Sequence, residues 1–377
     1  MTFDIKVLRT ADEICAMKDE WVALEKRSQG IHVFQSFDLS KHVLNLTGRE
    51  HENAYYVICV LEAGKLVGLL PLVVWHKKGR KILTGFSEPY QQYTEMLCDP
   101  DCDPKQIFDQ MQSCFKDSGA DYVHLGQVRH DGPLFAGCQG YFDHSDEEKA
   151  APFVDLSQWE DYDAYYNHLK RATRKRIRNG YNRFDRMGTL DHTHGSQREL
   201  LVNVIDRSYE GRVDWQRRLG LTSRAFQDEA FREFLDRFKD SEDENLKVAA
   251  FCFMLNGEPV ADQWGFIYDD CYYAFMSTWD EEKATAGPGK LHLGEVIKSC
   301  YELGLKRVDF LIPSVQYKMV YATGEVDASD LIKPLNGKGY LYANVWLKQV
   351  RPKLKAVMQA MPAEQRKKII NTIFNRK

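Results

Sequence analysis

One order of elements recurs along the chain and constrains its fold more than any other feature. Residues 55–74 (YYVICVLEAGKLVGLLPLVV) and 247–268 (KVAAFCFMLNGEPVADQWGFIY) each predict two strands around a glycine turn, the second at the hairpin dipeptide Asn256-Gly257. Each hairpin is followed by another strand, a loop, a helix and a further strand, 121–128 in one case and 306–313 in the other. The recurrence predicts an α/β fold with mixed sheets, built from two tandem domains of one topology.

Length and composition fit this organisation. The 377 residues are enough for two domains of ordinary size, with 44% hydrophobic and 28% charged residues. We expect domains over 1–150 and 151–343, followed by a tail over 344–377. The net charge of −4 gives the whole chain no attraction to nucleic acid or to an anionic membrane, so local patches matter more.

The cysteines and the hydrophobic segments indicate a cytoplasmic protein without a metal. The nine cysteines form no C-x-x-C motif, and Cys98 and Cys102 have no histidine at zinc-ligand spacing. We expect reduced thiols. The first residues lack the apolar core of a signal peptide, and the most apolar run, 66–75, is too short to span a bilayer.

The loop before the helix differs between the two copies. In the first copy, residues 97–108 contain three aspartates and no glycine, so they would repel a phosphate. In the second, Gly287-Pro288-Gly289-Lys290 opens a helix, where backbone N–H groups and the helix dipole favour an anion. The turn is not a Walker A loop, because Leu291 follows the lysine. It predicts an anion site in the second copy only, and a purely structural turn is the alternative.

Two further segments are strongly basic. Residues 170–186 hold eight Lys or Arg and one acid, and Arg171, Arg174, Lys175 and Arg178 have the spacing of one helix face. This face is either simply solvated or contacts an anionic acceptor or cofactor. The tail over 344–377 carries nine basic residues, one glutamate and an apolar stripe that begins at Trp346. We expect the tail to pack on its own domain, and peripheral contact with a membrane is the alternative.

Several segments, in this order, resemble the GNAT superfamily of N-acyltransferases. They are HLKRATRKRIRN (168–179), NGEPVADQWG (256–265), the run over 275–297 and YELGLKRVDFLIPSVQYKMVYA (301–322), with support from 34–43 and 66–72. More closely the chain resembles the CelD/BcsL-like branch, related in fold to Fem-type peptidoglycan aminoacyltransferases. The superfamily's R/Q-x-x-G-x-G/A turn is met at its two final glycines, whereas the leading Arg or Gln is missing.

The resemblance implies two tandem GNAT-like domains, of which the first is degenerate. It also implies transfer of an acyl group, from acetyl-CoA or another acyl-CoA, to an amine or hydroxyl of a small molecule, sugar or cell-envelope precursor. The alternatives are a Fem-type transferase that uses aminoacyl-tRNA and a binding protein without catalysis. Backbone N–H groups at the edge of the strand over 272–279 are candidates for holding the oxyanion.

The expected site residues follow from this resemblance and from the chemistry of acyl transfer. Tyr317 resembles the tyrosine that protonates the departing thiolate, Lys318 would stabilise the oxyanion or hold the acceptor, and Asp262 would be the base. The expected cofactor-binding residues are Ser277, Trp279, Gly287, Gly289, Lys290 and Leu291. The expected substrate-binding residues are Arg174, Arg178 and Gln263.

Each catalytic candidate also has a structural alternative. Tyr317, with Tyr321 one turn later, could be a core aromatic, Lys318 a surface lysine and Asp262 a structural ion-pair partner. Among other polar residues, we expect Asp309 to be a satisfied strand carboxylate. His192 and His194 are expected in a polar loop and His292 at the surface.

Overall fold

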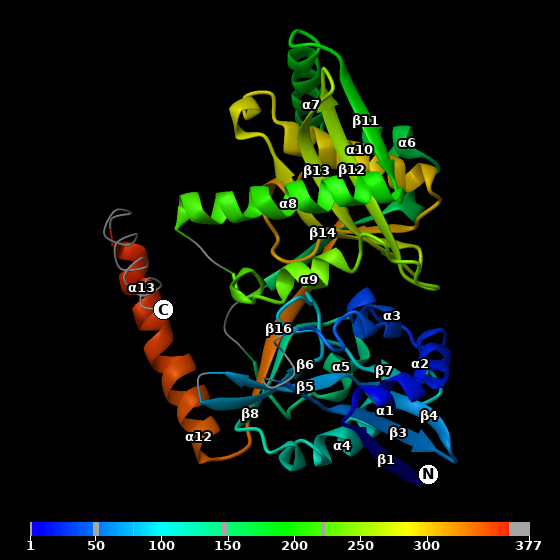
Figure 1. Cartoon of the computed structure of the whole chain (residues 1–377), viewed down its shortest axis with the longest axis vertical. Coiled ribbons are helices and arrows are strands. Elements are labelled where there is room, and N and C mark those ends of the chain that lie inside the picture. The colour runs from blue at the N-terminus through cyan, green and yellow to red at the C-terminus, as the bar shows by residue number, and fades with distance from the viewer. Residues whose placement is uncertain (1, 48–52, 78, 145–148, 221–222, 362–377) are drawn as a thin grey trace.

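The structure, a computed structural model, describes residues 2–47, 53–77, 79–144, 149–220 and 223–361 (Figure 1). The first half of the chain alternates short helices with strands that form two sheets. Its elements are β1 (Phe3–Leu8), α1 (Ala11–Ala16), α2 (Lys18–Glu25), α3 (Phe37–Lys41), β2 (Asn53–Tyr55), β3 (Val57–Glu62), β4 (Lys65–Leu70), β5 (Leu72–Lys77), β6 (Arg80–Gly85), β7 (Leu97–Cys98), α4 (Pro104–Ser113), β8 (Tyr122–Arg129), α5 (Pro133–Gly137) and β9 (Asp143–His144).

The second half has longer helices and strands. Its elements are β10 (Lys149–Asp155), α6 (Tyr162–His168), α7 (Arg171–Phe184), β11 (Leu190–Gly195), α8 (Arg198–Leu219), α9 (Phe231–Asp236), β12 (Lys247–Leu255), β13 (Glu258–Tyr268), β14 (Cys271–Trp279), α10 (Pro288–Glu302), β15 (Arg307–Asp309), α11 (Gln316–Met319), β16 (Gly324–Pro334), α12 (Gly337–Tyr340), a π-helical turn segment (Leu341–Val350) and α13 (Arg351–Ala360).

A sheet of twelve strands runs through both halves in the order β11-β12-β13-β14-β15-β10-β16-β8-β6-β5-β2, with β9 also paired to β16. Strand β16 joins the halves, because its first residues pair with β10 and its last residues pair with β8. Eleven residues give β16 a length of roughly 36 Å, enough to serve both neighbours. The boundary expected at 150/151 therefore falls inside β10, and the one at 343 falls inside the π-helical segment.

The two halves also share a hydrophobic core. Phe34 of the first half packs on Tyr93 and also contacts Tyr273 of β14 and Phe266 of β13. Helix α8 covers this face of the second-half sheet, whereas α10 and α7 cover the opposite face (Figure 1). A separate sheet, β1-β3-β4-β7, packs beside α4 in the first half.

The predicted recurrence and the mixed α/β class are confirmed, with two local differences. Both hairpins form, β3–β4 and β12–β13, and helices α4 and α10 are followed by Gly119 and Gly304 in the left-handed region. The first half inserts a second hairpin, β5–β6, before its helix. In the second half, strand β15 after helix α10 stops at Asp309 rather than continuing to residue 313, because Leu311 turns to a φ of 59°.

Candidate active site

Two neighbouring parallel strands, β14 and β15, separate soon after they pair. Strand β14 is paired with β13 along nearly its whole length, but with β15 only from Cys271 to Tyr273. Among the described residues, no strand pairs with the same edge of β14 from Ala274 to Trp279. The backbone N–H groups on this open edge are therefore available to a ligand, as expected for oxyanion donors.

A bulge bends β14 at the point where its partner ends. Trp264 faces Met276 while Phe266 faces Tyr273, so two residues of β14 oppose the single Gly265. A Cβ at Gly265 would collide with the carbonyl oxygen of Tyr273, so only glycine fits there. Such a bulge increases local twist and turns the following residues away from the regular pleat.

The predicted glycine turn opens α10 next to the end of β14. Gly287 is the N-cap, with φ 73° and ψ 50°, no side chain caps the helix, and Pro288 is the first helical residue. A Cβ added to Gly289 would lie 3.1 Å from Cδ1 of Trp279, so this ring packs on the first turn of α10. Trp279, Gly287 and Gly289 are thus brought together, with Lys290 exposed beside them.

Two of the expected cofactor-binding residues have a different environment. Leu291 points into the core beneath α7 rather than toward solvent. Ser277 is half-buried on β14, opposite Gln263 of β13, which is itself buried. Leu291 and Ser277 therefore both lie close to the glycine turn, but the side chain of Leu291 packs in the core.

The basic helix α7 packs directly over this turn. Gly180 allows the close approach, since a Cβ there would lie 2.9 Å from Cδ1 of Leu291 and 3.1 Å from the carbonyl oxygen of Ala286. Arg183 donates to the carbonyl oxygen of Thr285, and Tyr181 donates to Glu295 of α10. The positive charge of α7 therefore lies near the helix N-terminus that the sequence singled out for an anion.

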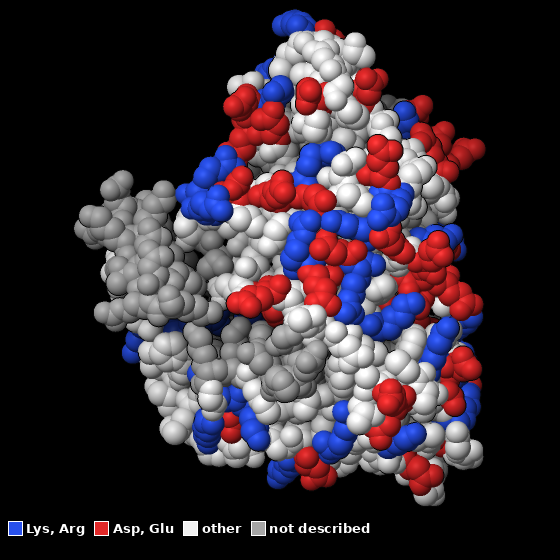
Figure 2. Space-filling view, in the orientation of Figure 1, with Lys and Arg blue, Asp and Glu red and all other residues white. Residues whose placement is uncertain are grey.

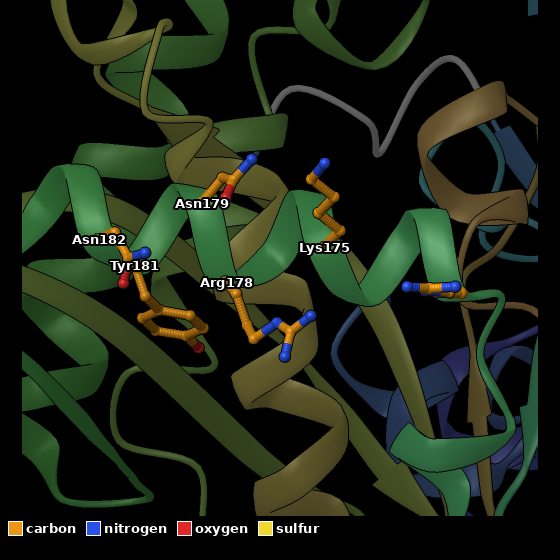
Figure 3. A pocket seen from close by; sticks show the side chains of 6 residues that line it. Lys175, Arg178, Asn179, Tyr181 and Asn182 are labelled. Atoms are coloured by element: carbon orange, nitrogen blue, oxygen red, sulfur yellow. The ribbon is translucent and has the colours of Figure 1, made fainter.

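A pocket of about 580 Å³ lies on the exposed side of α7 (Figure 3). In Figure 3, Arg178 and Tyr181 lie on one side of the helix axis and Lys175 and Asn179 on the other. Its lining residues are Arg171, Lys175, Arg178, Asn179, Tyr181 and Asn182. Arg174 is not among them, because its guanidinium donates to the backbone and side-chain oxygens of Asn167 at 2.9 and 3.1 Å.

Tyr317 and Lys318 lie on the short helix α11 that follows β15. Tyr317 is 40% exposed, and partial burial raises the pKa of its phenol, with a smaller opposing effect from Arg212. Lys318 Nζ donates to the carbonyl oxygens of Leu311 at 2.9 Å and Pro313 at 3.1 Å. Burial lowers the pKa of Lys318 to about 8, Asp309 opposes this shift and Arg212 adds to it. Lys318 is thus not a freely solvated surface lysine.

Other contacts bring α11, α10 and β14 to one place. Gly211 of α8 packs against the side chain of Thr278 on the open part of β14, and the next residue is Arg212, whose charge acts on both Tyr317 and Lys318. Tyr321, just after α11, donates from its hydroxyl to the carbonyl oxygen of Lys290 at 2.8 Å. We therefore define the candidate site as the open edge of β14, the first turn of α10 and α11.

Asp262 is held in a buried ion pair rather than left free. The residue is 2% exposed, and Nε and Nη2 of Arg207 each donate to one of its carboxylate oxygens at 2.8 Å. Such a bidentate pair fixes α8 on β13 and stabilises the charged carboxylate. No local pattern pointed to Arg207 as the partner, because the two residues are far apart in the chain.

The expectation for Asp309 is confirmed, and its partners join the two halves. Its Oδ1 accepts from the Tyr93 hydroxyl and from the backbone N–H of Leu311, both at 2.8 Å, while Oδ2 accepts from Arg129 at 2.6 Å. Arg129 also donates to Asp131. Arg129 and Tyr93 come from β8 and the loop before β7, so no local pattern could have identified them.

The histidines lie elsewhere than expected. His192 and His194 belong to strand β11 rather than to a loop. His292, on α10, is buried and its ring stacks on Phe253 of β12. Burial lowers the pKa of His192 to about 4 and that of His292 to about 3. The surface position expected for His292 is wrong because it lies on the core-facing side of α10.

Comparison with known proteins places this geometry in a fold family. Residues 171–319 match the model of the acetyltransferase (GNAT) domain. FemX is similar over 87% of this chain and 98% of its own, with 14% identity and a TM-score of 0.56. A tandem GNAT protein from the clavulanic acid pathway is similar over 89% and 99%, with 11% identity and a TM-score of 0.51.

A protein from Bacteroides thetaiotaomicron of unknown function has a TM-score of 0.55 at 13% identity, covering 87% of this chain and all of its own. No curated protein sequence matches the chain significantly. The CelD/BcsL-like branch stays a prediction. The chain has a mixed α/β GNAT fold, and its region from α7 to α11 matches the GNAT acetyltransferase domain.

Proposed function

We propose that the chain is an acyltransferase that takes an acyl group from acetyl-CoA or another acyl-CoA. The observation that carries the proposal is the separation of β14 from β15 beside the first turn of α10. The open edge of β14 offers N–H groups to a thioester carbonyl, and the glycine turn under the basic helix α7 offers N–H groups and positive charge to phosphates.

In the reaction, an amine or hydroxyl of the acceptor attacks the thioester carbon and its carbonyl oxygen becomes an oxyanion. The N–H groups of β14 and the ammonium group of Lys318 stabilise that oxygen. As the carbon–sulfur bond breaks, Tyr317 donates its proton to the thiolate, and the proton lost by the attacking amine or hydroxyl restores the Tyr317 phenol. Both oxygens of Asp262 accept from Arg207, so we give it a positioning role for α8 rather than that of the base.

The acceptor class follows the resemblance: a small molecule, a sugar or a cell-envelope precursor. Arg178 and Lys175 would contact an acidic group of donor or acceptor from the pocket on α7. Arg174 would not contact the substrate directly, because its guanidinium donates to Asn167. Gln263 is buried in β13, on the side of β14 away from its open edge, so direct contact with a substrate is not expected.

A matched pair of substitutions tests the donor site. Gly289→Asp and Gly289→Asn both place a side chain of similar size against Trp279, but only the aspartate adds negative charge where phosphate is proposed to bind. We expect acetyl-CoA affinity, measured by calorimetry, to fall at least tenfold further in the aspartate variant. Equal affinity in wild type and both variants would move the donor site elsewhere.

A second candidate is a Fem-type transferase that uses aminoacyl-tRNA, favoured by the basic surface of α7. Filter binding with charged tRNA, compared with acetyl-CoA calorimetry, separates the two. If this candidate is right, the wild-type protein binds charged tRNA with an affinity that falls as the salt concentration rises. Lys175→Glu combined with Arg178→Glu would then abolish this binding. Mass shifts of candidate amines and sugars incubated with protein and acetyl-CoA would identify the acceptor.

A further inference from the structure

The helix that ends the described part of the chain exposes a row of large apolar side chains. It runs from α12 through the π-helical segment to α13, and in Figure 1 α13 extends away from the sheets. Six of its apolar residues are 40% to 62% exposed: Tyr340, Leu341, Val345, Trp346, Leu354 and Val357. Their spacing of about one turn makes a single stripe, with half-buried Val350 between Trp346 and Leu354.

Within the described residues, the contacts between this helix and the body are made by its first half. Tyr342 stacks on Tyr122 of β8, with ring centroids 4.9 Å apart, and lies under the guanidinium of Arg80. Gly339 abuts the backbone of Asp121, and Lys348 pairs with Asp143 at 3.0 Å. From 351 to 360, every residue whose exposure the structure describes is exposed. The expectation that the tail packs on its own domain is therefore not met over this stretch.

The charge of the helix has one sign. Residues 337–361 contain five Lys or Arg and no Asp or Glu, in a chain whose net charge is −4. On the face of the body that Figure 2 shows, by contrast, basic and acidic side chains are interspersed. Lys353 and Arg351 are exposed within α13, close to Leu354 in the apolar stripe.

We infer that this helix, which we call the docking helix (337–360), binds the surface of an anionic phospholipid bilayer. Its apolar stripe enters the region between headgroups and acyl chains, while its Lys and Arg side chains meet lipid phosphates. Trp346 and Tyr340 suit this interface, since their rings combine an apolar body with a polar group. A nucleic acid would use the charge but leave the stripe in water, and two copies of this positively charged helix would repel each other.

The attachment is peripheral. Within the described residues, no helix is long and apolar enough to cross a membrane. Because Tyr342 fixes the π-helical segment to β8 and β6, binding would hold the whole body at a defined position on the bilayer. This inference does not depend on the proposed acyltransferase activity.

Sedimentation of the full chain with vesicles tests the inference. We expect binding to vesicles of phosphatidylglycerol mixed with phosphatidylcholine, weaker binding to phosphatidylcholine alone, and loss of affinity at high salt. Arg351→Gln with Lys353→Gln should weaken binding about 25-fold, from about fivefold per charge near an anionic surface. The matched control is Lys6→Gln with Lys18→Gln, two exposed lysines on β1 and α2, which lie on the opposite side of the molecule from α13 in Figure 1, and it should bind as wild type.

A second set removes the stripe and keeps the charge. Leu341→Ser, Trp346→Ser and Leu354→Ser together should reduce binding at least about 1000-fold, since each buried side chain contributes roughly tenfold or more. The control replaces three exposed apolar residues elsewhere, Ile5, Met187 and Leu303, by serine. Circular dichroism melting should be unchanged in both sets, because the replaced side chains face solvent.

Three results would overturn the inference. The first is wild-type protein that sediments no more with anionic vesicles than without vesicles. The second is equal binding by the stripe variant and its control. The third is a wild-type dimer in light scattering that the stripe variant converts to monomer, which would assign the stripe to a second copy of the chain.

Discussion

Replacing Asp309 by asparagine should destabilise the protein strongly, because it breaks the charge pair between the two halves. Asp309 and Arg129 are each 2% exposed at their side chains, with Oδ2 and Nη1 2.6 Å apart. Asparagine can keep the bonds to Tyr93 and to the N–H of Leu311 but leaves the guanidinium without its buried counter-charge. Breaking one member of a buried pair costs about 3–5 kcal/mol.

The remaining partner of Arg129 moderates this cost. Asp131 still accepts from Nε at 3.0 Å and from Nη2 at 2.8 Å, although its own side chain is 44% exposed. We therefore expect Asp309→Asn to lower the free energy of unfolding by about 2–3 kcal/mol, a large share of the 5–15 kcal/mol typical of folded proteins.

Urea unfolding followed by circular dichroism measures this change. The control is Arg129→Met combined with Asp309→Asn, in which no guanidinium is left uncompensated. The double variant should lose less than the sum of the two single variants, with a coupling of about 1–3 kcal/mol. A loss below about 0.5 kcal/mol in Asp309→Asn, or strict additivity, would refute the importance assigned to the pair.

Three further predictions concern titratable groups. Tyr317→Phe should keep the melting temperature, since the ring is partly exposed. In an acetyl-CoA assay, kcat should fall by about 10²–10⁴-fold, and an unchanged kcat would mean that another residue is the acid. If the ammonium form of Lys318 holds the oxyanion, kcat should fall as pH rises through about 8, and Lys318→Met should remove that limb of the pH profile. His192 and His292 have folded pKa values below the unfolded value of about 6.5, so unfolding takes up protons below that pH. The free energy of unfolding should therefore fall by up to about 1.4 kcal/mol per pH unit for each histidine between pH 6.5 and its folded pKa. In urea unfolding below about pH 6.5, His292→Leu should lose stability less steeply with falling pH than wild type.

The sequence identified features that are fixed by neighbouring residues. Asn256-Gly257 produced the expected hairpin, because both residues adopt the positive φ that the turn needs. Gly287 and Pro288 opened α10 as expected, since a left-handed cap and a fixed φ are local requirements. The basic face of α7 was likewise visible as a helical repeat of charge.

Tertiary structure alone decided how these pieces meet. Strand pairing across the chain let β16 serve both halves, so the sheet is continuous where the sequence predicted a boundary. Arg207 reached Asp262 from another element, and α7 came to lie over the glycine turn because Gly180 leaves space for Leu291. Local sequence encodes φ, ψ and amphipathic faces, whereas the choice of partner depends on which distant surfaces can be buried together.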